Sequence, residues 1–493
     1  MRIRTYATSA TVTAIATAVA AAATAGLALA PTASAAPASA PEAITSDLNG
    51  DGYPDLAVGV PDASVGGDAK AGYVNVVWGG PNGVGSLGSV RVTQSTAGVP
   101  GTPEPGDRFG AAVAVADADG DGTADLVIGG PGEDVDGAGT DAGTVAVLRG
   151  GAGGFGTGFT AVNGPSASAA YGKSLAAADL TGDAKTDLAV GATDKVVLRT
   201  SAGVLSTVFT GSMGGRAPVM TTGDFDDDGT ADLATGYWTV DDPFTQSHVR
   251  LWSWDATESV LANIWNTDNS GVSALAAGDF DGDGHDDLVL GECREIADEN
   301  IDDPCGPEAT AKGGGVHIEY GGPEGWFGGR EQTLNQDTAG VPGVAETGDR
   351  FGAALAVRDI DGDGRDDLVA GAPGEAIGTV SKAGAVTVLF GTASGLADAS
   401  GRARSVAYNQ DTTHVMGIAE AGDAFGGAAT VSDFDHDGSM DLAVGSPGEN
   451  AKSGGVWIFR AASAVHSYTI TPSQMGLPSP ASALGYGGTL SSH

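Results

Sequence analysis

Residues 117–129 read DADGDGTADLVIG, an acidic loop that runs directly into a short apolar stretch ending in glycine. The same pattern occurs seven times in the 493-residue chain, beginning at Asp47, Asp117, Asp179, Asp224, Asp279, Asp359 and Asp433. Self-similarity on this scale indicates a repeat architecture, in which each repeat is one supersecondary unit. The spacing varies, since 45 residues separate Asp179 from Asp224 and 80 separate Asp279 from Asp359. Loops of different length therefore join a constant unit.

Short apolar stretches surround each acidic loop. In the second repeat, residues 109–115 precede the loop, residues 126–129 follow it, and residues 143–148 form a third stretch. A weaker fourth stretch occurs in other repeats, for example at residues 404–408. Alternation with period two, rich in Val, Ile, Phe and Thr, is typical of strands. Four strands in each of seven units predict an all-β protein, a seven-bladed β-propeller.

The two ends of the chain complement each other. Phe109 lies eight residues before the loop at Asp117, whereas only a linker precedes the loop at Asp47. Residues 486–493 (YGGTLSSH) are similar to residues 425–432 (FGGAATVS), and they stop where another acidic loop would begin. The C-terminal strand is therefore predicted to pair into the first blade. A ring closed in this way has no free sheet edge.

The acidic loops follow D-x-[DN]-x-[DN]-G-x-x-D, with departures in the third copy. A lone match is often only a solvated acidic turn, but seven equivalent matches favour a metal site. Oxygen-only ligands suit Ca²⁺, and Mg²⁺ seldom uses an all-protein cage. Positions 1, 3, 5 and 9 would supply side chains and position 7 a carbonyl, while Gly at position 6 permits a positive φ. The predicted ligands are Asp47, Asn49, Asp51, Tyr53 and Asp55; Asp117, Asp119, Asp121, Thr123 and Asp125; Asp179, Thr181, Asp183, Lys185 and Asp187; Asp224, Asp226, Asp228, Thr230 and Asp232; Asp279, Asp281, Asp283, His285 and Asp287; Asp359, Asp361, Asp363, Arg365 and Asp367; and Asp433, Asp435, Asp437, Ser439 and Asp441.

Up to seven calcium ions are thus expected, but the third loop departs most from the pattern. It has Thr181 at position 3 and Ala184 in place of Gly, so the site at Asp179 is predicted to be the weakest or empty. Asp286 and Asp366, which lie beside ligands, are predicted to be solvated, as is Asp227. The formal net charge of −40 agrees with bound cations and disfavours nucleic acid or anionic membranes as partners.

Residues 1–35 are predicted to be a signal peptide. Arg2 and Arg4 form a basic start, an Ala-rich apolar stretch follows, and Ala33-Ser34-Ala35 is a small-residue cleavage site. The alternative is a weak membrane anchor. Residues 36–43 are then a linker, residues 44–493 the propeller, and the protein is expected to be secreted, with no membrane span and as a monomer.

In an oxidising compartment Cys293 and Cys305 are expected to form a disulfide. The alternative, a metal site, lacks further Cys or His residues nearby.

These residues resemble a known family. Phe-Gly before a loop and Gly-Ala-Pro after it are typical of FG-GAP repeats, as in the N-terminal propeller of integrin alpha subunits. The matches are Phe109-Gly110 with residues 129–131, Phe351-Gly352 with 371–373, and Phe425-Gly426 with 445–447. The resemblance implies a seven-bladed propeller with calcium between strands 1 and 2 of a blade. It also implies ligand binding on the opposite face and an extracellular role in adhesion or recognition.

Three long connections repeat on that opposite face, at residues 93–107, 334–349 and 409–423. Their equivalent residues Glu104, Glu346 and Glu420, with Arg108 and Arg350, are candidates for ligand contact or for pairing with a neighbouring blade. The seven tryptophans would pack between blades or stack on carbohydrate.

Because H-E-x-x-H, G-x-S-x-G and nucleotide-loop motifs are missing from the sequence, no catalytic residue and no enzyme activity are predicted. The expected function is recognition of an extracellular protein or glycan; a lectin or a polysaccharide-degrading enzyme is the alternative.

Overall fold

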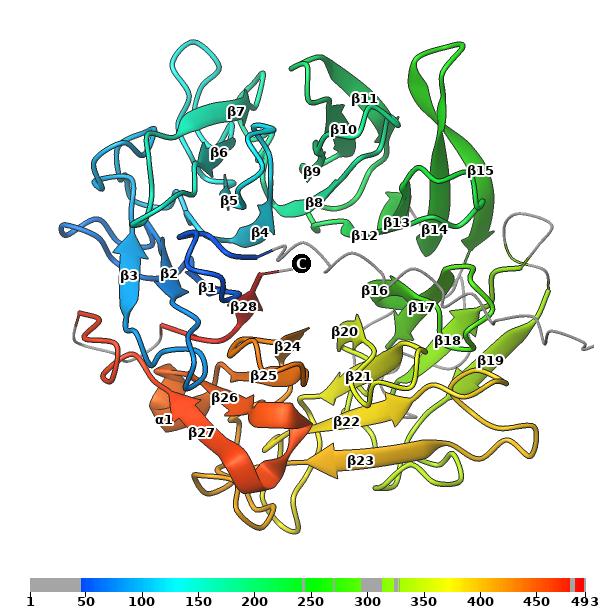
Figure 1. Cartoon of the computed structure of the whole chain (residues 1–493). Coiled ribbons are helices and arrows are strands. Elements are labelled where there is room, and N and C mark those ends of the chain that lie inside the picture. Colours follow the sequence, from blue (N-terminus) through cyan, green and yellow to red (C-terminus); the bar gives the residue numbers. More distant parts are fainter. Residues whose placement is uncertain are drawn as a thin grey trace, which may run out of the picture. The chain divides into compact units, whose positions relative to one another are not determined.

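The repeats form seven antiparallel sheets of four strands each, arranged as the blades of a propeller (Figure 1). The computed structural model describes residues 46–241, 244–268, 271–293, 313–322, 327, 329–478 and 484–491. Ile44–His493 is one compact unit. The predicted signal peptide, residues 1–35, and the linker, residues 36–43, lie outside the described residues.

Each blade takes its strands in sequence order, except the first. Blades 1 to 4 comprise β28 (Thr489–Leu490), β1 (Leu56–Val60), β2 (Tyr73–Val77) and β3 (Ser89–Val92); β4 (Ala112–Ala116), β5 (Asp125–Gly130), β6 (Thr144–Leu148) and β7 (Phe159–Asn163); β8 (Ser174–Ala178), β9 (Asp187–Gly191), β10 (Lys195–Arg199) and β11 (Leu205–Thr210); and β12 (Val219–Gly223), β13 (Asp232–Asp241), β14 (Phe244–Asp255) and β15 (Val260–Asp268). Blades 5 to 7 comprise β16 (Val272–Gly278), β17 (Asp287–Glu292), β18 (Gly315–Glu319) and β19 (Glu331–Leu334); β20 (Ala354–Arg358), β21 (Asp367–Ala372), β22 (Ala385–Phe390) and β23 (Arg404–Tyr408); and β24 (Ala428–Ser432), β25 (Asp441–Ser446), β26 (Gly455–Phe459) and β27 (Ser467–Ile470). The short helices α1 (Glu449–Lys452), η1 (Arg460–Ala462) and η2 (Ala464–His466) all belong to blade 7.

The second and third strands of each blade form the core. In blade 2, every residue of β5 and β6 is buried, whereas the outermost strand β7 is largely half-exposed or exposed. A middle strand is covered by a neighbouring blade on both faces, so both sets of alternating side chains are apolar. This explains why residues 126–130 (LVIGG) are all apolar or glycine instead of alternating with polar residues.

The ring closes between its first and last strands, as the sequence predicts. β28 pairs antiparallel with β1, with Val58 opposite Leu490 and Gly59 opposite Thr489. Just before β28, Tyr486 is fully buried, and its hydroxyl donates to Asn75 Oδ1 at 3.0 Å. The two ends of the chain therefore share one blade.

The Phe-Gly pairs lie between blades rather than at the start of a strand. Phe109 precedes β4 and forms a parallel bridge with Gly72 of blade 1. In this bridge the N–H of Phe109 donates to the Ala71 carbonyl at 2.9 Å. Gly72 has φ +80°, and a Cβ there would lie 2.3 Å from the Phe109 carbonyl oxygen. Equivalent bridges join Gly143 to Tyr171, Gly314 to Phe351, Gly384 to Phe425 and Gly454 to Tyr486. The strand begins at Ala112, three residues later than the alternation suggests, because Phe109 is used to connect the blades.

Tryptophans serve packing throughout the described part of the chain. Trp78, Trp238, Trp252, Trp254, Trp265 and Trp457 are all buried or half-buried, and Trp326 lies outside the described residues. Trp252, for example, stacks on Phe209 with the ring centroids 5.5 Å apart and donates from Nε1 to Thr235 Oγ1. Among the helices that the structure describes, none is long and apolar enough to cross a membrane.

Candidate metal centres

Every acidic loop is wound around the carboxylate at its first position. In blade 2, Asp117 Oδ1 accepts the N–H groups of Gly120 at 2.8 Å and Asp121 at 3.0 Å, and Oδ2 accepts that of Gly122 at 2.8 Å. The bond from position 6 to the first carboxylate recurs in all seven loops. Gly122 has φ +89°, which a residue with a Cβ adopts only at a cost. The loop thus folds its backbone inward, so that its carboxylates converge.

The aspartate at position 9 joins the acidic loop to the rest of the blade. Asp125 is the first residue of β5 and is fully buried. Its Oδ2 accepts the N–H of Ala118 at 3.1 Å, and its Oδ1 accepts that of Gly150, in the connection between β6 and β7, at 3.0 Å. The connections between strands 1 and 2 and between strands 3 and 4 therefore meet on one face, which we call the acidic-loop face.

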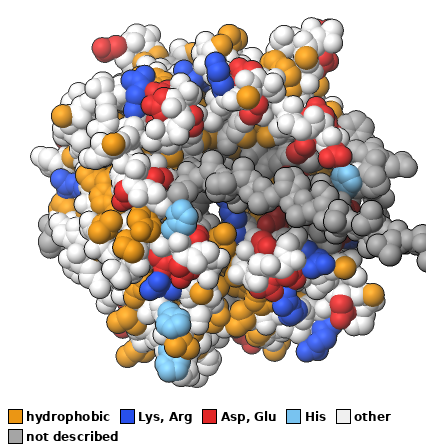
Figure 2. All heavy atoms as spheres, in the orientation of Figure 1, with side chains coloured by type: hydrophobic (Ala, Val, Ile, Leu, Met, Phe, Trp, Pro, Cys, Tyr) orange, Lys and Arg blue, Asp and Glu red, His pale blue; other side chains and the backbone are white. Residues whose placement is uncertain are grey.

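The structure brings the predicted ligands of positions 1, 3 and 9 together. In four blades, one oxygen of each carboxylate lies within 4.8 Å of the others: Asp117, Asp119 and Asp125; Asp224, Asp226 and Asp232; Asp279, Asp281 and Asp287; and Asp359, Asp361 and Asp367. Figure 2 shows acidic side chains in separate groups around the ring, several of them beside a Lys or Arg. A hard cation with several oxygen ligands fits a set of donors of this kind.

Burial of the position-9 carboxylates is electrostatically unfavourable without a positive charge. Burial, with a smaller contribution from neighbouring aspartates, raises the pKa of Asp287 to about 8 and that of Asp232 to about 7. Burial also raises the pKa of Asp55 and Asp441 to about 7. In blade 4, the buried atoms Asp226 Oδ1 and Asp232 Oδ1 have no hydrogen-bond donor. Uncompensated, buried oxygens of this kind fit a dication, which would favour the ionised form of all the carboxylates at once.

Arginines beside the acidic loops were not anticipated from the sequence. Each pairs with the carboxylate at position 3 of its own blade: Arg149 with Asp119, Arg330 with Asp281, Arg404 with Asp361 and Arg460 with Asp435. The arginines lie in or next to the connection between strands 3 and 4, which reaches the acidic-loop face. A signal existed, because Arg149 and Arg460 directly follow the third strand in their repeats. In blades 2, 5, 6 and 7 they offset part of the negative charge and orient the carboxylate.

The third loop keeps the turn despite its altered sequence. Ala184 stands at position 6 with φ +61°, and its N–H donates to Asp179 Oδ2 at 2.7 Å, as the glycines do elsewhere. At position 5, Asp183 Oδ2 accepts a hydrogen bond from Ser201 Oγ at 2.8 Å. The loop therefore has the shape of the others, with a strained residue and one carboxylate fewer.

Replacing Ala184 with glycine is expected to stabilise the protein. The left-handed conformation costs an L-residue about 1 kcal/mol relative to glycine. We expect the Ala184→Gly variant to unfold at a higher denaturant concentration, with a free energy of unfolding about 1 kcal/mol larger. The matched control is Ala178→Gly at the end of β8, where φ is not positive and glycine should destabilise. A variant no more stable than the parent would contradict the strain at Ala184.

Two aspartates predicted to be solvated instead connect neighbouring blades, so that prediction was wrong. Asp286 Oδ2 accepts the N–H of Asp224 at 2.8 Å, and Asp366 Oδ2 accepts that of Asp279 at 3.0 Å. Both carboxylates point from one acidic loop to the start of the preceding one. Asp227 is exposed, as predicted. The acidic loops of blades 4, 5 and 6 are therefore coupled through hydrogen bonds.

The opposite face, which we call the long-loop face, has its own repeated cluster. The Nε2 group of Gln336 donates to Glu375 Oε2 at 2.6 Å, and Asp349 Oδ2 accepts the Glu346 N–H at 2.6 Å. The same contacts occur between Gln94 and Glu133 with Asp107, and between Gln410 and Glu449 with Asp423. Each cluster fastens a long connection to the next blade.

The charged side chains proposed for ligand contact are exposed. Glu104, Glu346 and Glu420 are exposed on the three long connections. Arg108 lies 3.4 Å from Asp62 of the neighbouring blade, with both side chains nearly half exposed. Pairing between blades is thus seen for Arg108, while the glutamate side chains face solvent.

The centre of the ring holds a cavity of about 380 Å³ lined by the innermost strands. Most of its lining residues are apolar or small, among them Leu175, Met220 and Leu355. Arg358 is the charged residue of this lining, and no described lining residue carries a carboxylate. The described part of the channel therefore lacks a pair of carboxylates that could act as acid and base.

The fold and its repeated loops define a class: a seven-bladed β-propeller that contains FG-GAP repeats. A family model of the FG-GAP repeat matches residues 109–148, 271–292, 351–389 and 425–459. A model of the FG-GAP-like repeat matches residues 47–128. The matches at 109–148, 351–389 and 425–459 begin at the three Phe-Gly pairs, and the match at 271–292 falls on blade 5, which has the acidic loop without Phe-Gly. The predicted resemblance is confirmed.

Curated relatives are similar over short segments. Phosphatidylinositol-glycan-specific phospholipase D of Rattus norvegicus is 32% identical over 177 residues, which are 35% of this chain and 18% of that protein. The Bos taurus protein of the same name is 40% identical over 90 residues, 18% of this chain and 11% of that protein. The chain thus spans less than a fifth of these relatives. A crystal structure of an exotype rhamnogalacturonan lyase shares 13% identity with a TM-score of 0.36, covering 85% of this chain and 70% of that one, and this level of likeness carries no functional conclusion.

The predicted disulfide stays a prediction, because Cys305 lies outside the described residues. Cys293 follows β17 directly, is buried and packs against Trp238 of blade 4. Most of residues 292–312, which connect β17 to β18, are likewise outside the described residues.

Proposed function

We propose that this protein is a secreted, calcium-stabilised recognition module that binds a protein ligand through its long-loop face. In this proposal, calcium in the acidic loops neutralises the clustered aspartates and holds the blades in place. The bound calcium keeps the blades rigid, and the long-loop face stays open to a ligand because metal binding and ligand binding use opposite ends of the strands.

The observation that carries the proposal is a pair of exposed aliphatic side chains at equivalent places on this face. Val344 is 64% exposed and Ile418 is 73% exposed, each three residues after a valine of its long connection. Large apolar side chains at such exposure on anchored loops are typical of a protein-binding surface. The partly buried Gln336–Glu375 pair and the buried Gln410–Glu449 pair hold the two connections, which lowers the entropic cost of binding.

The test is a binding screen against purified extracellular proteins, with immobilised glycans in parallel. We expect a protein ligand whose affinity falls at least about tenfold in a Val344→Asp, Ile418→Asp double variant, since charged groups would enter an apolar contact. The matched control is Val465→Asp, because Val465 is 63% exposed but lies between β26 and β27 on the acidic-loop face. EDTA should also abolish binding.

Three outcomes would overturn the proposal. One is equal binding by the double variant and the parent protein. Another is binding to glycans alone, which would favour a lectin. The third is release of products from a polysaccharide, which would favour an enzyme.

A further inference from the structure

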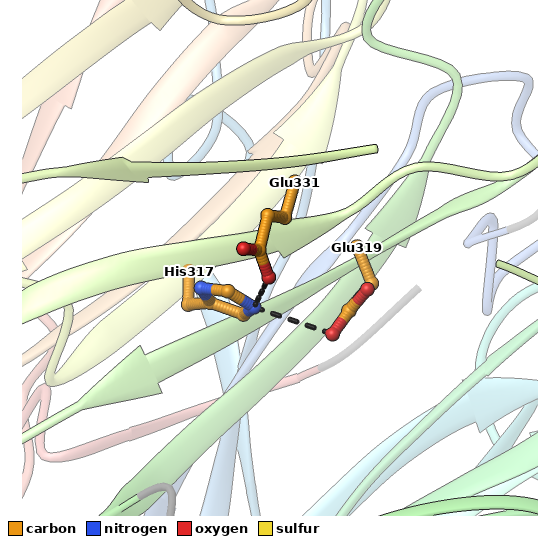
Figure 3. A group of neighbouring side chains, drawn as sticks. All are labelled: His317, Glu319 and Glu331. Atoms are coloured by element: carbon orange, nitrogen blue, oxygen red, sulfur yellow. Dashed lines mark hydrogen bonds and ion pairs between the residues drawn. The ribbon is translucent and has the colours of Figure 1, made fainter. Parts of the chain in front are cut away.

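His317, Glu319 and Glu331 form a cluster on the third and fourth strands of blade 5, outside the sequence of the acidic loop (Figure 3). His317 and Glu319 lie two residues apart on β18, so both project from the same face of the sheet. On the adjacent strand β19, Glu331 lies opposite Glu319, and Thr333 lies opposite His317. The strand register alone therefore brings the four side chains together.

The placement of the two glutamates is unfavourable without a positive charge between them. Like charges directly opposite each other on paired strands destabilise a sheet. Here His317 Nε2 lies between the two carboxylates, 3.3 Å from Glu319 Oε1 and 3.6 Å from Glu331 Oε2. One imidazole thus faces two carboxylate oxygens, one each from Glu319 and Glu331.

The two distances from His317 to the glutamates match coordination of one small cation. Two donors bound to a tetrahedral Zn²⁺ at about 2.0–2.1 Å lie about 3.3–3.4 Å apart. The His317–Glu319 distance of 3.3 Å equals this separation, and the His317–Glu331 distance of 3.6 Å is close to it. A mixed nitrogen and oxygen donor set also differs in kind from the all-oxygen loops, because imidazole suits zinc and its neighbours better than calcium.

The second ring nitrogen of His317, Nδ1, is hydrogen-bonded to a neighbouring side chain. Its Nδ1 lies 3.1 Å from Thr333 Oγ1, which can accept the Nδ1 proton. Metal-binding histidines usually donate their other N–H to a neighbouring oxygen, which fixes the ring and leaves the free nitrogen for the ion. Thr333 would do this here and direct Nε2 toward the glutamates.

A cavity adjoins the cluster. It has a volume of about 410 Å³ and is lined by the three cluster residues together with Glu292, Thr333 and Thr267, the last from β15 of blade 4. Three protein ligands leave the fourth position of a zinc ion open to this space. Glu292 adds a further carboxylate to the cavity wall.

We propose that His317, Glu319 and Glu331 bind one zinc-class divalent ion, with an open coordination position toward the cavity between blades 4 and 5. This site is separate from the calcium loops in position and in ligand chemistry. It does not depend on the recognition function proposed above.

Zinc uptake in the presence of excess Ca²⁺ tests the proposal, because calcium would occupy the acidic loops. Equilibrium dialysis of the full chain should give one zinc ion per chain. Co²⁺ in place of zinc should give visible absorption bands of a four- or five-coordinate ion. His317→Ala and Glu331→Gln should each weaken zinc binding at least about tenfold, whereas His466→Ala, which removes an exposed imidazole next to β27, should not.

Unchanged calcium-dependent melting would show that both variants fold. Absence of zinc uptake in excess calcium would overturn the proposal. Full uptake by the folded His317→Ala variant would overturn it as well.

Discussion

Removal of calcium with EDTA is expected to lower the melting temperature by about 10 °C. At about 1 mM calcium, a site with a dissociation constant near 10⁻⁴ M contributes about 1.4 kcal/mol. Seven such sites together contribute about 10 kcal/mol, which is comparable with the whole stability of many domains. An ordered unit of this length has an unfolding entropy of about 1 kcal/mol per kelvin, which converts that energy into about 10 °C. Scanning calorimetry with and without EDTA measures the shift directly.

The size of this shift should depend on pH. In the calcium-free protein, burial raises the pKa of the position-9 aspartates above the value of about 4 for an unfolded chain, to about 6 for Asp125 and about 8 for Asp287. The folded state then binds more protons, so the calcium-free protein loses stability as pH rises from about 5 to 8. The effect of EDTA should therefore be largest at pH 8 and smaller at pH 5.5. Equal melting temperatures with and without EDTA at pH 8 would contradict calcium binding, and Mg²⁺ at the same concentration should restore little.

Replacement of Tyr486 with alanine is expected both to destabilise the protein and to make it associate, because Tyr486 lies where the ring closes. Tyr486 is fully buried and packs in one cluster with Val58 and Tyr73. Loss of a large buried aromatic side chain costs about 3–5 kcal/mol. Detachment of β28 would also expose the edge of β1, which can pair with another molecule. We expect a lower melting temperature together with dimers or larger species in light scattering after size-exclusion chromatography.

Phe425→Ala is the matched control, since Phe425 makes the equivalent bridge between blades 6 and 7. It should cost a similar free energy but leave β28 paired, so the protein should stay monomeric. Equal association of the two variants would show that exposure of the closing edge is not the cause.

The repeated pattern determines which features of the structure could be predicted from the sequence alone. Seven copies of one pattern were sufficient to predict the sheets, the pairing of the C-terminal strand and the convergence of residues such as Asp117 and Asp125. Contacts between repeats could not be predicted from the sequence in the same way. The links from Asp286 and Asp366 to neighbouring loops depend on how one blade is rotated against the next, and no pattern within a repeat encodes this rotation.

The register between paired strands sets a second limit on what the sequence can predict. His317 and Glu331 are separated by a connection of irregular length, and only the pairing of β18 with β19 places them together. A shift of the register by one residue would put Glu331 on the other face of the sheet. The arginines beside the acidic loops were missed for a related reason, because Arg330 and Arg404 lie at the start of the fourth strand and reach Asp281 and Asp361 in the connection between strands 1 and 2.

The pairing of β28 with β1 also has a consequence for the order of events in the cell. Ala57 and Ser491, which are hydrogen-bonded in the closed ring, are 434 positions apart in the chain. At a synthesis rate of about 5–20 residues per second, the ribosome needs about 20–90 s between these two residues. The first blade must wait unfinished for that time, and it becomes a four-stranded sheet only after the other six blades have been synthesised.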